Sequence, residues 1–160
     1  MKAHRLLFVC MPALLLSAAG DPFVGTWKLD AYRSKFAIGE PRFMFATMKI
    51  ESSGTGLKST ASAADGEGVA SDFTFNCSLD GTPCNIVAAI PMRGVSAVDA
   101  ISLKRVDDHT IAATGFRNRK IVYEDQRVVS ADGKTMSVTR KGMTPEGKKY
   151  ESTLLLERIR

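Results

Sequence analysis

Short segments in which apolar and polar residues alternate, separated by tight-turn signals, follow one another along most of this chain. The clearest alternation lies between residues 69 and 77, where Val69, Ser71, Phe73 and Phe75 share one face and the intervening residues share the other. A period of two is typical of half-buried β-strands. No segment beyond residue 20 sustains the apolar period of an amphipathic helix. The sequence therefore predicts an all-β fold.

Tight turns set the order of the predicted strands. Asp-Gly and Glu-Gly pairs at 65–68, 132–133 and 146–147 are typical of hairpins, which join neighbouring antiparallel strands. Such a meander closes into a barrel or folds into a sandwich. We expect an antiparallel up-and-down meander of about 8–10 strands, closed into a β-barrel. The strand candidates lie at 24–30, 43–51, 57–62, 69–77, 85–90, 99–106, 110–114, 120–130, 135–141 and 149–159.

The first twenty residues have the features of a secretory signal peptide. Lys2 and Arg5 precede an apolar run of about eleven residues, and the small residues at 17–20 supply a cleavage site. The alternative is a retained membrane anchor, but the run is much shorter than the ~20 residues of a membrane-spanning helix. We predict a signal peptide at 1–20, a single domain at 21–160, and export to a periplasm or out of the cell.

The charge of the mature chain gives no indication of a nucleic-acid partner. Removal of Lys2 and Arg5 from the 22 basic side chains leaves an excess of about three over the 17 acidic ones. The remaining basic residues are scattered among acidic ones, and the short basic run at 117–120 has no interleaved aromatic residues. We expect no binding to nucleic acid.

Cys77 and Cys84 are the two cysteines of the mature chain, and in an oxidising compartment they are expected to pair. A two-residue turn at Asp80-Gly81 would place them opposite each other in a hairpin, and a longer, looser turn is the alternative. Closing a loop of eight residues contributes on the order of 2 kcal/mol in the chain-entropy model. The chain has no Cys-x-x-Cys motif, so the predicted role is structural.

A second turn, at Asp132-Gly133, predicts the register of the strands on either side. A two-residue loop there pairs 125 with 140 and 124 with 141, which opposes two pairs of unlike charges. The two pairs lie on opposite faces of the ribbon. The face that carries residues 125 and 140 is either a charge-matched outer surface or the wall of a polar-lined cavity. In the cavity, Asp125 neutralises Arg140 and leaves Arg127 as the freer cation. The face carries Tyr123, Asp125, Arg127, Met136, Val138 and Arg140.

The segment 23–29, Phe-Val-Gly-Thr-Trp-Lys-Leu, contains the only tryptophan. It resembles the first strand of the calycin superfamily, the lipocalins and the intracellular fatty-acid-binding proteins. The resemblance implies a calycin-like barrel in which Gly25 lets the strand bend and Trp27 plugs one end. It also implies that an arginine of the last strand packs across the indole, and both Arg158 and Arg160 are candidates.

A wider pattern, which includes the segments 33–36 and 129–139, is similar to small exported bacterial proteins described as lipocalin-like, which have no established activity. Two features of fatty-acid-binding proteins are missing. The connection at 31–41 is too short for their helix-turn-helix lid, and the residue two positions after Arg158 is Arg160 rather than the tyrosine of their carboxylate-binding motif. The resemblance therefore implies a fold more firmly than it implies a fatty acid.

No catalytic arrangement is visible, so we expect a non-enzymatic protein without a cofactor or metal. His109, the one histidine of the mature chain, follows two aspartates in a predicted turn, where a solvated hairpin tip is favoured over a metal ligand. The segment 94–98 half-matches a nucleophile elbow but lacks its final glycine and its strand-helix context, and is expected to be a loop.

Two functional hypotheses remain. In the first, the barrel binds a small apolar or amphipathic ligand and Arg127 contacts its polar head group; if no ligand is bound, the same side chains form a solid core. In the second, a filled barrel contacts a protein or cell-wall partner through the loops at 91–98 and 117–119. A cavity well below ~300 Å³ favours the second. The proposed lining of the first consists of Met48, Phe73, Phe75, Tyr123, Arg127 and Met136.

Overall fold

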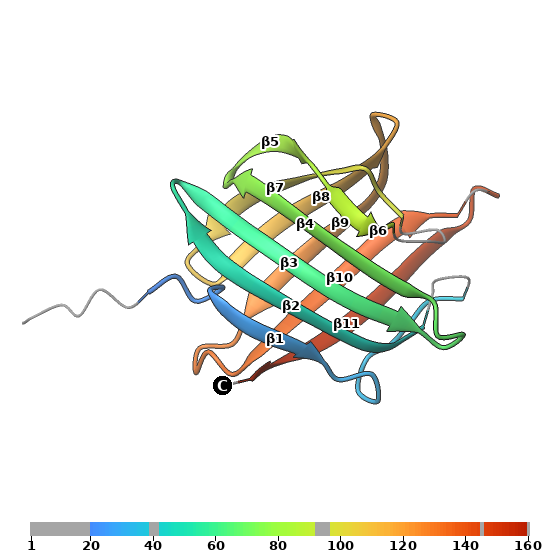
Figure 1. The fold of residues 1–160 in the computed structure, drawn as a ribbon, viewed down its shortest axis with the longest axis horizontal. Coiled ribbons are helices and arrows are strands. Elements are labelled where there is room, and N and C mark those ends of the chain that lie inside the picture. The colour runs from blue at the N-terminus through green and yellow to red at the C-terminus, as the bar shows by residue number, and fades with distance from the viewer. Residues whose placement is uncertain (1–19, 39–41, 92–96, 145, 160) are drawn as a thin grey trace, which may run out of the picture.

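The computed structural model describes residues 20–38, 42–91, 97–144 and 146–159, and the regular elements within these ranges are all β-strands. No helix in this part of the chain is long and apolar enough to span a bilayer. The predicted signal peptide lies outside the described residues, except for Gly20. The strands in Figure 1 are β1 (Gly25–Leu29), β2 (Phe43–Ser53), β3 (Gly56–Asp65), β4 (Ala70–Ser78), β5 (Asp80–Asn85), β6 (Val87–Ile90), β7 (Ala100–Asp107), β8 (Thr110–Arg117), β9 (Lys120–Val129), β10 (Thr135–Met143) and β11 (Lys149–Ile159).

The strands form one antiparallel sheet that curls into a nearly closed barrel (Figure 1). Two meanders, β1 to β4 and β7 to β11, are joined where the first and last strands pair, with Trp27 opposite Arg158. The remaining edges, β4 and β7, are bridged by the segment 80–90. Its first half, β5, pairs with β7, and its second half, β6, pairs with β4. The predicted all-β barrel is confirmed.

The bridging segment also corrects two details of the prediction. Because residues 80–85 form a strand of their own, β5, ahead of the predicted one at 85–90, the described residues form eleven strands rather than ten. The predicted hairpin with a turn at Asp80-Gly81 is wrong, because β5 takes its partner from β7. Pro83 has no backbone N–H to donate, so this strand can pair fully on one side only.

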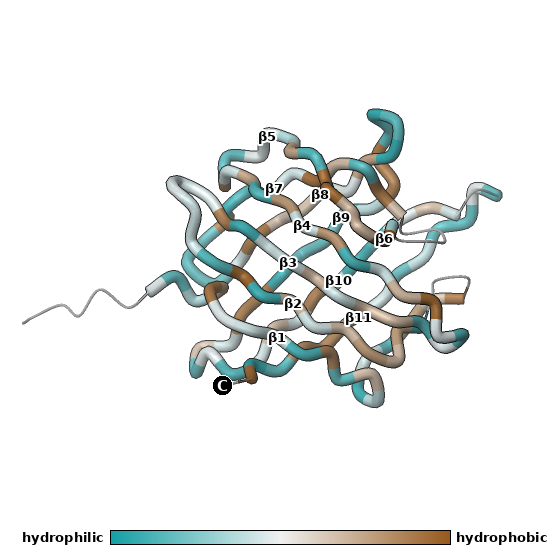
Figure 2. The backbone as a smooth tube through the Cα atoms, in the orientation of Figure 1, coloured by the Kyte–Doolittle hydropathy of each residue, from teal (hydrophilic) through white to brown (hydrophobic). Residues whose placement is uncertain are grey.

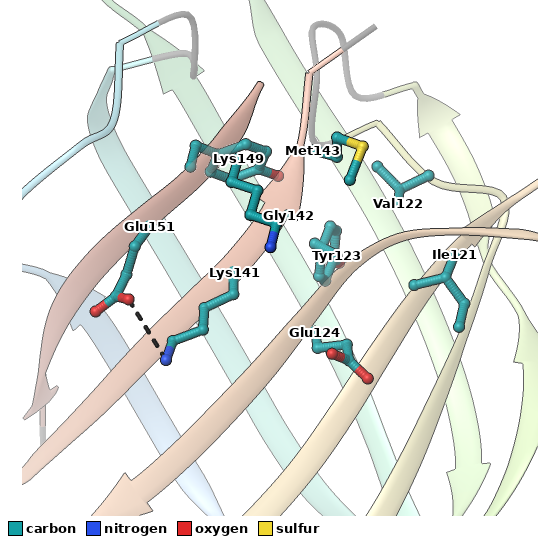
Figure 3. A pocket seen from close by; sticks show the side chains of 10 residues that line it. Ile121, Val122, Tyr123, Glu124, Lys141, Gly142, Met143, Lys149 and Glu151 are labelled. Carbon is teal, nitrogen blue, oxygen red and sulfur yellow. Dashed lines mark ion pairs between the residues drawn. The ribbon is translucent and has the colours of Figure 1, made fainter. Parts of the chain in front are cut away.

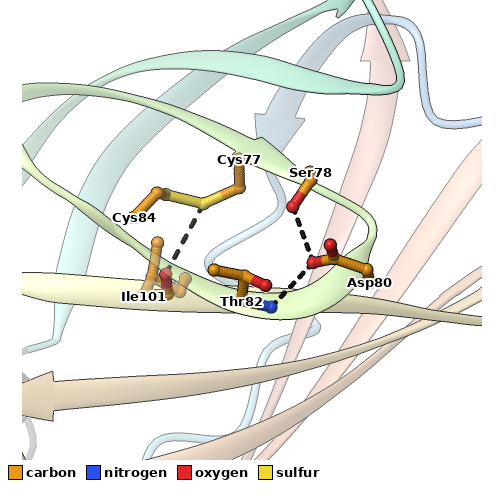
Figure 4. The surroundings of a disulfide bond; sticks show 6 residues. All are labelled: Cys77, Ser78, Asp80, Thr82, Cys84 and Ile101. Carbon is orange, nitrogen blue, oxygen red and sulfur yellow. Dashed lines mark hydrogen bonds between the residues drawn. A yellow bond between two sulfur atoms is a disulfide. The ribbon is translucent and has the colours of Figure 1, made fainter.

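The predicted disulfide is nevertheless confirmed: Cys77 and Cys84 are bonded, with their Cα atoms 5.4 Å apart (Figure 4). Cys77 Sγ lies 3.5 Å from the Ile101 carbonyl oxygen on β7. The turn between the cysteines is organised by Asp80, whose carboxylate accepts hydrogen bonds from the Ser78 hydroxyl (2.6 Å) and the Thr82 N–H (2.8 Å). These bonds, that of Ser78 first, lower the pKa of Asp80 to about 2. The disulfide thus fastens the seam of the barrel.

The Asp132-Gly133 turn has the predicted register, with Asp125 opposite Arg140 and Glu124 opposite Lys141. Gly133 adopts a φ of 68°, which a glycine tolerates without strain. The Asp132 carboxylate accepts hydrogen bonds from the Ser130 hydroxyl and the Lys134 N–H, at 2.7 and 3.0 Å. This turn sets which side chains of β9 and β10 face the interior.

Hydrophobic and hydrophilic residues alternate along the strands, as the tube in Figure 2 shows. We call the end of the barrel that holds Phe23 and the turns β7–β8 and β9–β10 the plugged end, and the opposite one the far end. Fully buried apolar side chains gather toward the plugged end. Large apolar side chains exposed at the far end include Ile38, Met44, Ile121 and Met143. The fold therefore packs one end tightly and leaves polar and apolar groups together near the other.

Candidate functional site

The plugged end is built around Trp27, whose side chain is completely buried. Its indole Nε1 donates a 2.9 Å hydrogen bond to the Phe23 carbonyl, and the guanidinium carbon of Arg158 lies 4.3 Å from its ring centroid. A Cβ atom on Gly25 would come within 2.3 Å of Arg158 Nη1, so this position needs a glycine. The structure thus places Gly25, Trp27 and Arg158 in one contact; Arg160 lies outside the described residues.

Arg158 has its donors occupied at this end. Nε donates to the Gly133 carbonyl at 2.6 Å, and the two terminal nitrogens donate to the carbonyls of Val24 and Pro22. A second arginine, Arg105, lies over the Phe23 ring and forms an ion pair with Asp21. Backbone carbonyls and a carboxylate therefore satisfy the cations of the plugged end, which indicates a structural role.

A second cationic group lies inside the barrel, on one face of β9 and β10. From the sequence, this face could be either an outer surface or a cavity wall. Asp125 is buried, and both of its oxygens accept hydrogen bonds from Arg140, Oδ1 from Nε at 2.8 Å and Oδ2 from Nη2 at 3.0 Å. The Arg140 guanidinium also lies 3.9 Å from the Tyr123 ring centroid. The face looks inward, so its interpretation as an outer surface is wrong.

Arg127 is the third member of this interior cluster, which consists of Asp125, Arg127 and Arg140. Its side chain is only 7% exposed, and Nη2 lies 3.4 Å from Asp125 Oδ2, at the long limit of a hydrogen bond. Its Nε is buried and has no acceptor among the described residues. Two guanidinium groups and one carboxylate give the cluster one formal positive charge. Within the described residues, the Nε of Arg127 is the group of this cluster that lacks a hydrogen-bond acceptor.

The cluster forms one wall of an interior cavity of about 100 Å³. Apolar side chains from β2, β4, β10 and β11 line much of the rest of it. The predicted residues Met48, Phe73, Arg127 and Met136 all line this cavity. Its full lining consists of Leu29, Phe43, Ala46, Thr47, Met48, Ala61, Ser62, Ala63, Phe73, Asp125, Arg127, Met136, Val138, Arg140, Leu154 and Leu156.

Two predicted lining residues lie elsewhere. Phe75 is buried in the core next to the seam, one inward position nearer the plugged end than Phe73. Tyr123 is buried beside Arg140 and lines a different hollow; burial raises its pKa above the ordinary value. Leu154 and Leu156 also line the cavity, but the run of three leucines in β11 hides the alternation that would mark them as inward-facing in the sequence.

The hollow that Tyr123 lines is on β9, β10 and β11 near the far end, with a volume of about 610 Å³ (Figure 3). A Cβ atom on Gly142 would lie 2.5 Å from the Tyr150 ring, so the glycine lets the ring cover the strand. Lys141 and Glu151 form an ion pair across its rim at 3.5 Å. Its charged groups are exposed and of both signs, so it offers a ligand no buried, uncompensated charge.

The other sequence candidates do not form a chemical site. His109 is half-buried in the β7–β8 turn rather than fully solvated, and its Nδ1 has no hydrogen-bond partner among the described residues. Within those same ranges, no three side chains of the metal-binding types come together. Arg117 donates to the Ala97 carbonyl, which ties the turn at 117–119 to the adjoining loop. The proposed elbow at 94–98 lies mostly outside the described residues.

The nearly closed barrel, its Gly-x-Trp first strand and the arginine stacked on that tryptophan are the features that the resemblance to the calycins implies. No protein-family model matches the sequence, and no curated protein is significantly similar to it. Among solved structures, the chain is similar to the zebrafish ileal bile acid-binding protein complexed with cholic acid. The identity is 9%, the TM-score is 0.49, and the match covers 86% of this chain and 99% of that one.

Proposed function

We propose that this chain binds one small amphipathic molecule inside its barrel, with Arg127 contacting an anionic head group. The observation that carries the proposal is the buried Nε of Arg127, which lines the cavity and has no acceptor among the described residues. A buried donor left unsatisfied costs about 1–3 kcal/mol, and more when it is charged. A ligand carboxylate would remove that cost and balance the positive charge of the cluster.

The neighbours of Arg127 support this role. Arg140 binds Asp125 through two hydrogen bonds, so the carboxylate is largely neutralised before Arg127 interacts with it. The rest of the cavity lining is mostly apolar, with Met48, Phe73 and Leu154 among its side chains. A cation together with apolar walls matches a molecule with one anionic and one apolar part.

The native mass of the purified, exported protein, before and after organic extraction, tests the proposal. We expect a stoichiometric small mass that extraction removes and that re-binds with reduced affinity to Arg127→Met. Export is itself part of the proposal, and a mature N-terminus at Gly20 or Asp21 is its expected sign. An apo mass under conditions that preserve the fold, with no ligand re-binding after a metabolite screen, would contradict the proposal.

One observation favours the second candidate function, a filled barrel that acts through its surface. The interior cavity is about 100 Å³, which is well below the ~300 Å³ of a typical ligand pocket. Ile38, Met44 and Ile121 are also exposed at the far end, where they could contact a partner. The orphan donor of Arg127 distinguishes the two candidates, because a filled barrel has no use for a buried cation without an acceptor.

A further inference from the structure

We infer that the interior ligand is a short carboxylate of two to four carbons, and that longer fatty acids overfill the cavity. This inference rests on the proposed function and names the class of ligand for the same site. It follows from three properties of the cavity: its volume, the chemistry of Arg127 and the packing of its walls.

The volume sets the size of the ligand. An engineered protein cavity of about 150 Å³ holds one benzene molecule, which has six carbon atoms. By the same ratio, a cavity of about 100 Å³ accommodates on the order of four non-hydrogen atoms. Acetate has four, propanoate five and butanoate six, so butanoate is the upper limit. A long-chain fatty acid has roughly three times as many atoms.

Arg127 and the apolar walls set the chemistry. A guanidinium group presents N–H donors in a planar fork that matches the two oxygens of a carboxylate. Inorganic anions of similar size would lose hydration against Met136, Leu154 and Leu156 without gaining apolar contact. A short carboxylate places its charge at Arg127 and its alkyl group against these side chains.

The walls resist expansion, because most of them belong to the packed core. Met136, Val138 and Leu156 are all at least 95% buried. Forcing additional methylenes into such an interior displaces side chains from their preferred rotamers. Leu154 differs, since it is only half-buried and lies opposite Val138. Truncation of Leu154 is the change that should enlarge the cavity at the smallest cost to the core.

Calorimetric titration of the mature protein with straight-chain carboxylates of two to sixteen carbons tests the inference. We expect affinity to rise about three- to fourfold with each methylene up to butanoate. It should then fall at least about tenfold at hexanoate and longer chains, which require repacking. Butanamide has the shape of butanoate without its charge, and should bind at least about tenfold more weakly.

Three variants accompany the titration. Leu154→Ala should move the tightest-binding chain about two carbons longer, because it removes three carbon atoms from the wall. Arg127→Met should abolish the preference for butanoate over butanamide. Lys120→Gln removes a charge from the exposed start of the same strand, β9, and should leave every affinity unchanged. Trp27 fluorescence verifies that each variant is folded.

The outcomes separate the two claims. Arg127-dependent binding of hexadecanoate in the wild-type protein, without binding of butanoate, would overturn the short-chain inference and leave the proposed function intact. Binding of neither short nor long carboxylates would overturn both. If Arg127→Met does not fold, an unshifted chain-length profile in Leu154→Ala overturns the inference, because the profile then does not depend on the cavity.

Discussion

Arg158 at the plugged end and Arg127 in the interior show how the same side chain can be structural or available for binding. Arg158 lies over Trp27 and donates to three backbone carbonyls, those of Gly133, Val24 and Pro22. Arg127 is more deeply buried, yet its one ion pair among the described residues is at 3.4 Å and its Nε lacks an acceptor. The difference lies in the partners rather than in burial.

The neighbouring charges make the same distinction. At the plugged end Arg105 forms an ion pair with Asp21, and the two opposite charges balance each other. In the interior, Asp125 is shared by two arginines and is bound closely by one of them. A fold that needed only a stable core would gain little from a second buried cation, because buried ion pairs are weak contributors to stability. The unbalanced charge of the cluster is therefore the basis of the proposed binding.

The largest effect is expected at the plugged end. Trp27→Ala removes a fully buried indole and should lower the free energy of unfolding by about 4–5 kcal/mol. Urea denaturation of the mature protein measures this change. A loss below about 1 kcal/mol would show that the indole does not hold the barrel together.

The next largest effect is expected in the interior cluster. Asp125→Asn leaves Arg127 and Arg140 buried without a carboxylate, and should destabilise the protein by about 3 kcal/mol. A bound carboxylate should recover part of this loss, so the midpoint of thermal unfolding should rise more with saturating butanoate than it does in the wild type. An unchanged stability in this variant would mean that the two cations are solvated rather than buried.

A matched pair of arginine substitutions tests the comparison itself. Arg158→Met should cost about 2–3 kcal/mol, because it abolishes several charge-assisted hydrogen bonds and the contact with Trp27. Arg127→Met should change stability by less than about 1 kcal/mol, because the cation it removes has a long ion pair with Asp125 and an Nε without an acceptor among the described residues. Equal losses from both changes in urea denaturation would contradict the distinction between the two sites.

A smaller loss than that of Arg158→Met is expected at the seam. Replacing both Cys77 and Cys84 with alanine should lower the free energy of unfolding by on the order of 2 kcal/mol, because it releases an eight-residue loop in the unfolded chain. The bridging segment 80–90 keeps its hydrogen bonds to β4 and β7, so the barrel should still form. Loss of the native circular dichroism spectrum would show that the disulfide, and not the pairing, closes the barrel.

Local turn chemistry explains which parts of the fold the sequence could predict. Asp132-Gly133 permits one tight register, and the pairing of β9 with β10 follows from it. The turn at Asp80-Gly81 looked equivalent, but β5 pairs with β7 some twenty residues further along the chain. A contact at that distance leaves no local signal, so the hairpin was wrongly predicted although the disulfide was correct.

The site was predictable only in part, for a related reason. A period of two assigns side chains to a face but not to a height along the barrel, so Phe73 and Phe75 were equivalent in sequence. In the structure Phe73 lines the cavity and Phe75 fills the core. Opposed unlike charges at Asp125 and Arg140 suit an outer surface as well as an interior, and the curvature of the sheet decides between them.

In the proposed function Arg127 offers a buried N–H donor to an anion inside the barrel, and its own Nε resonance reports on that contact. In protein labelled with ¹⁵N-arginine, the Nε–Hε signal that disappears in Arg127→Met can be followed during titration with butanoate. We predict a saturable downfield shift of this proton and slower exchange with water, while the Arg158 signal stays fixed. An Arg127 signal that does not move at saturating concentrations of any carboxylate tested would contradict the account.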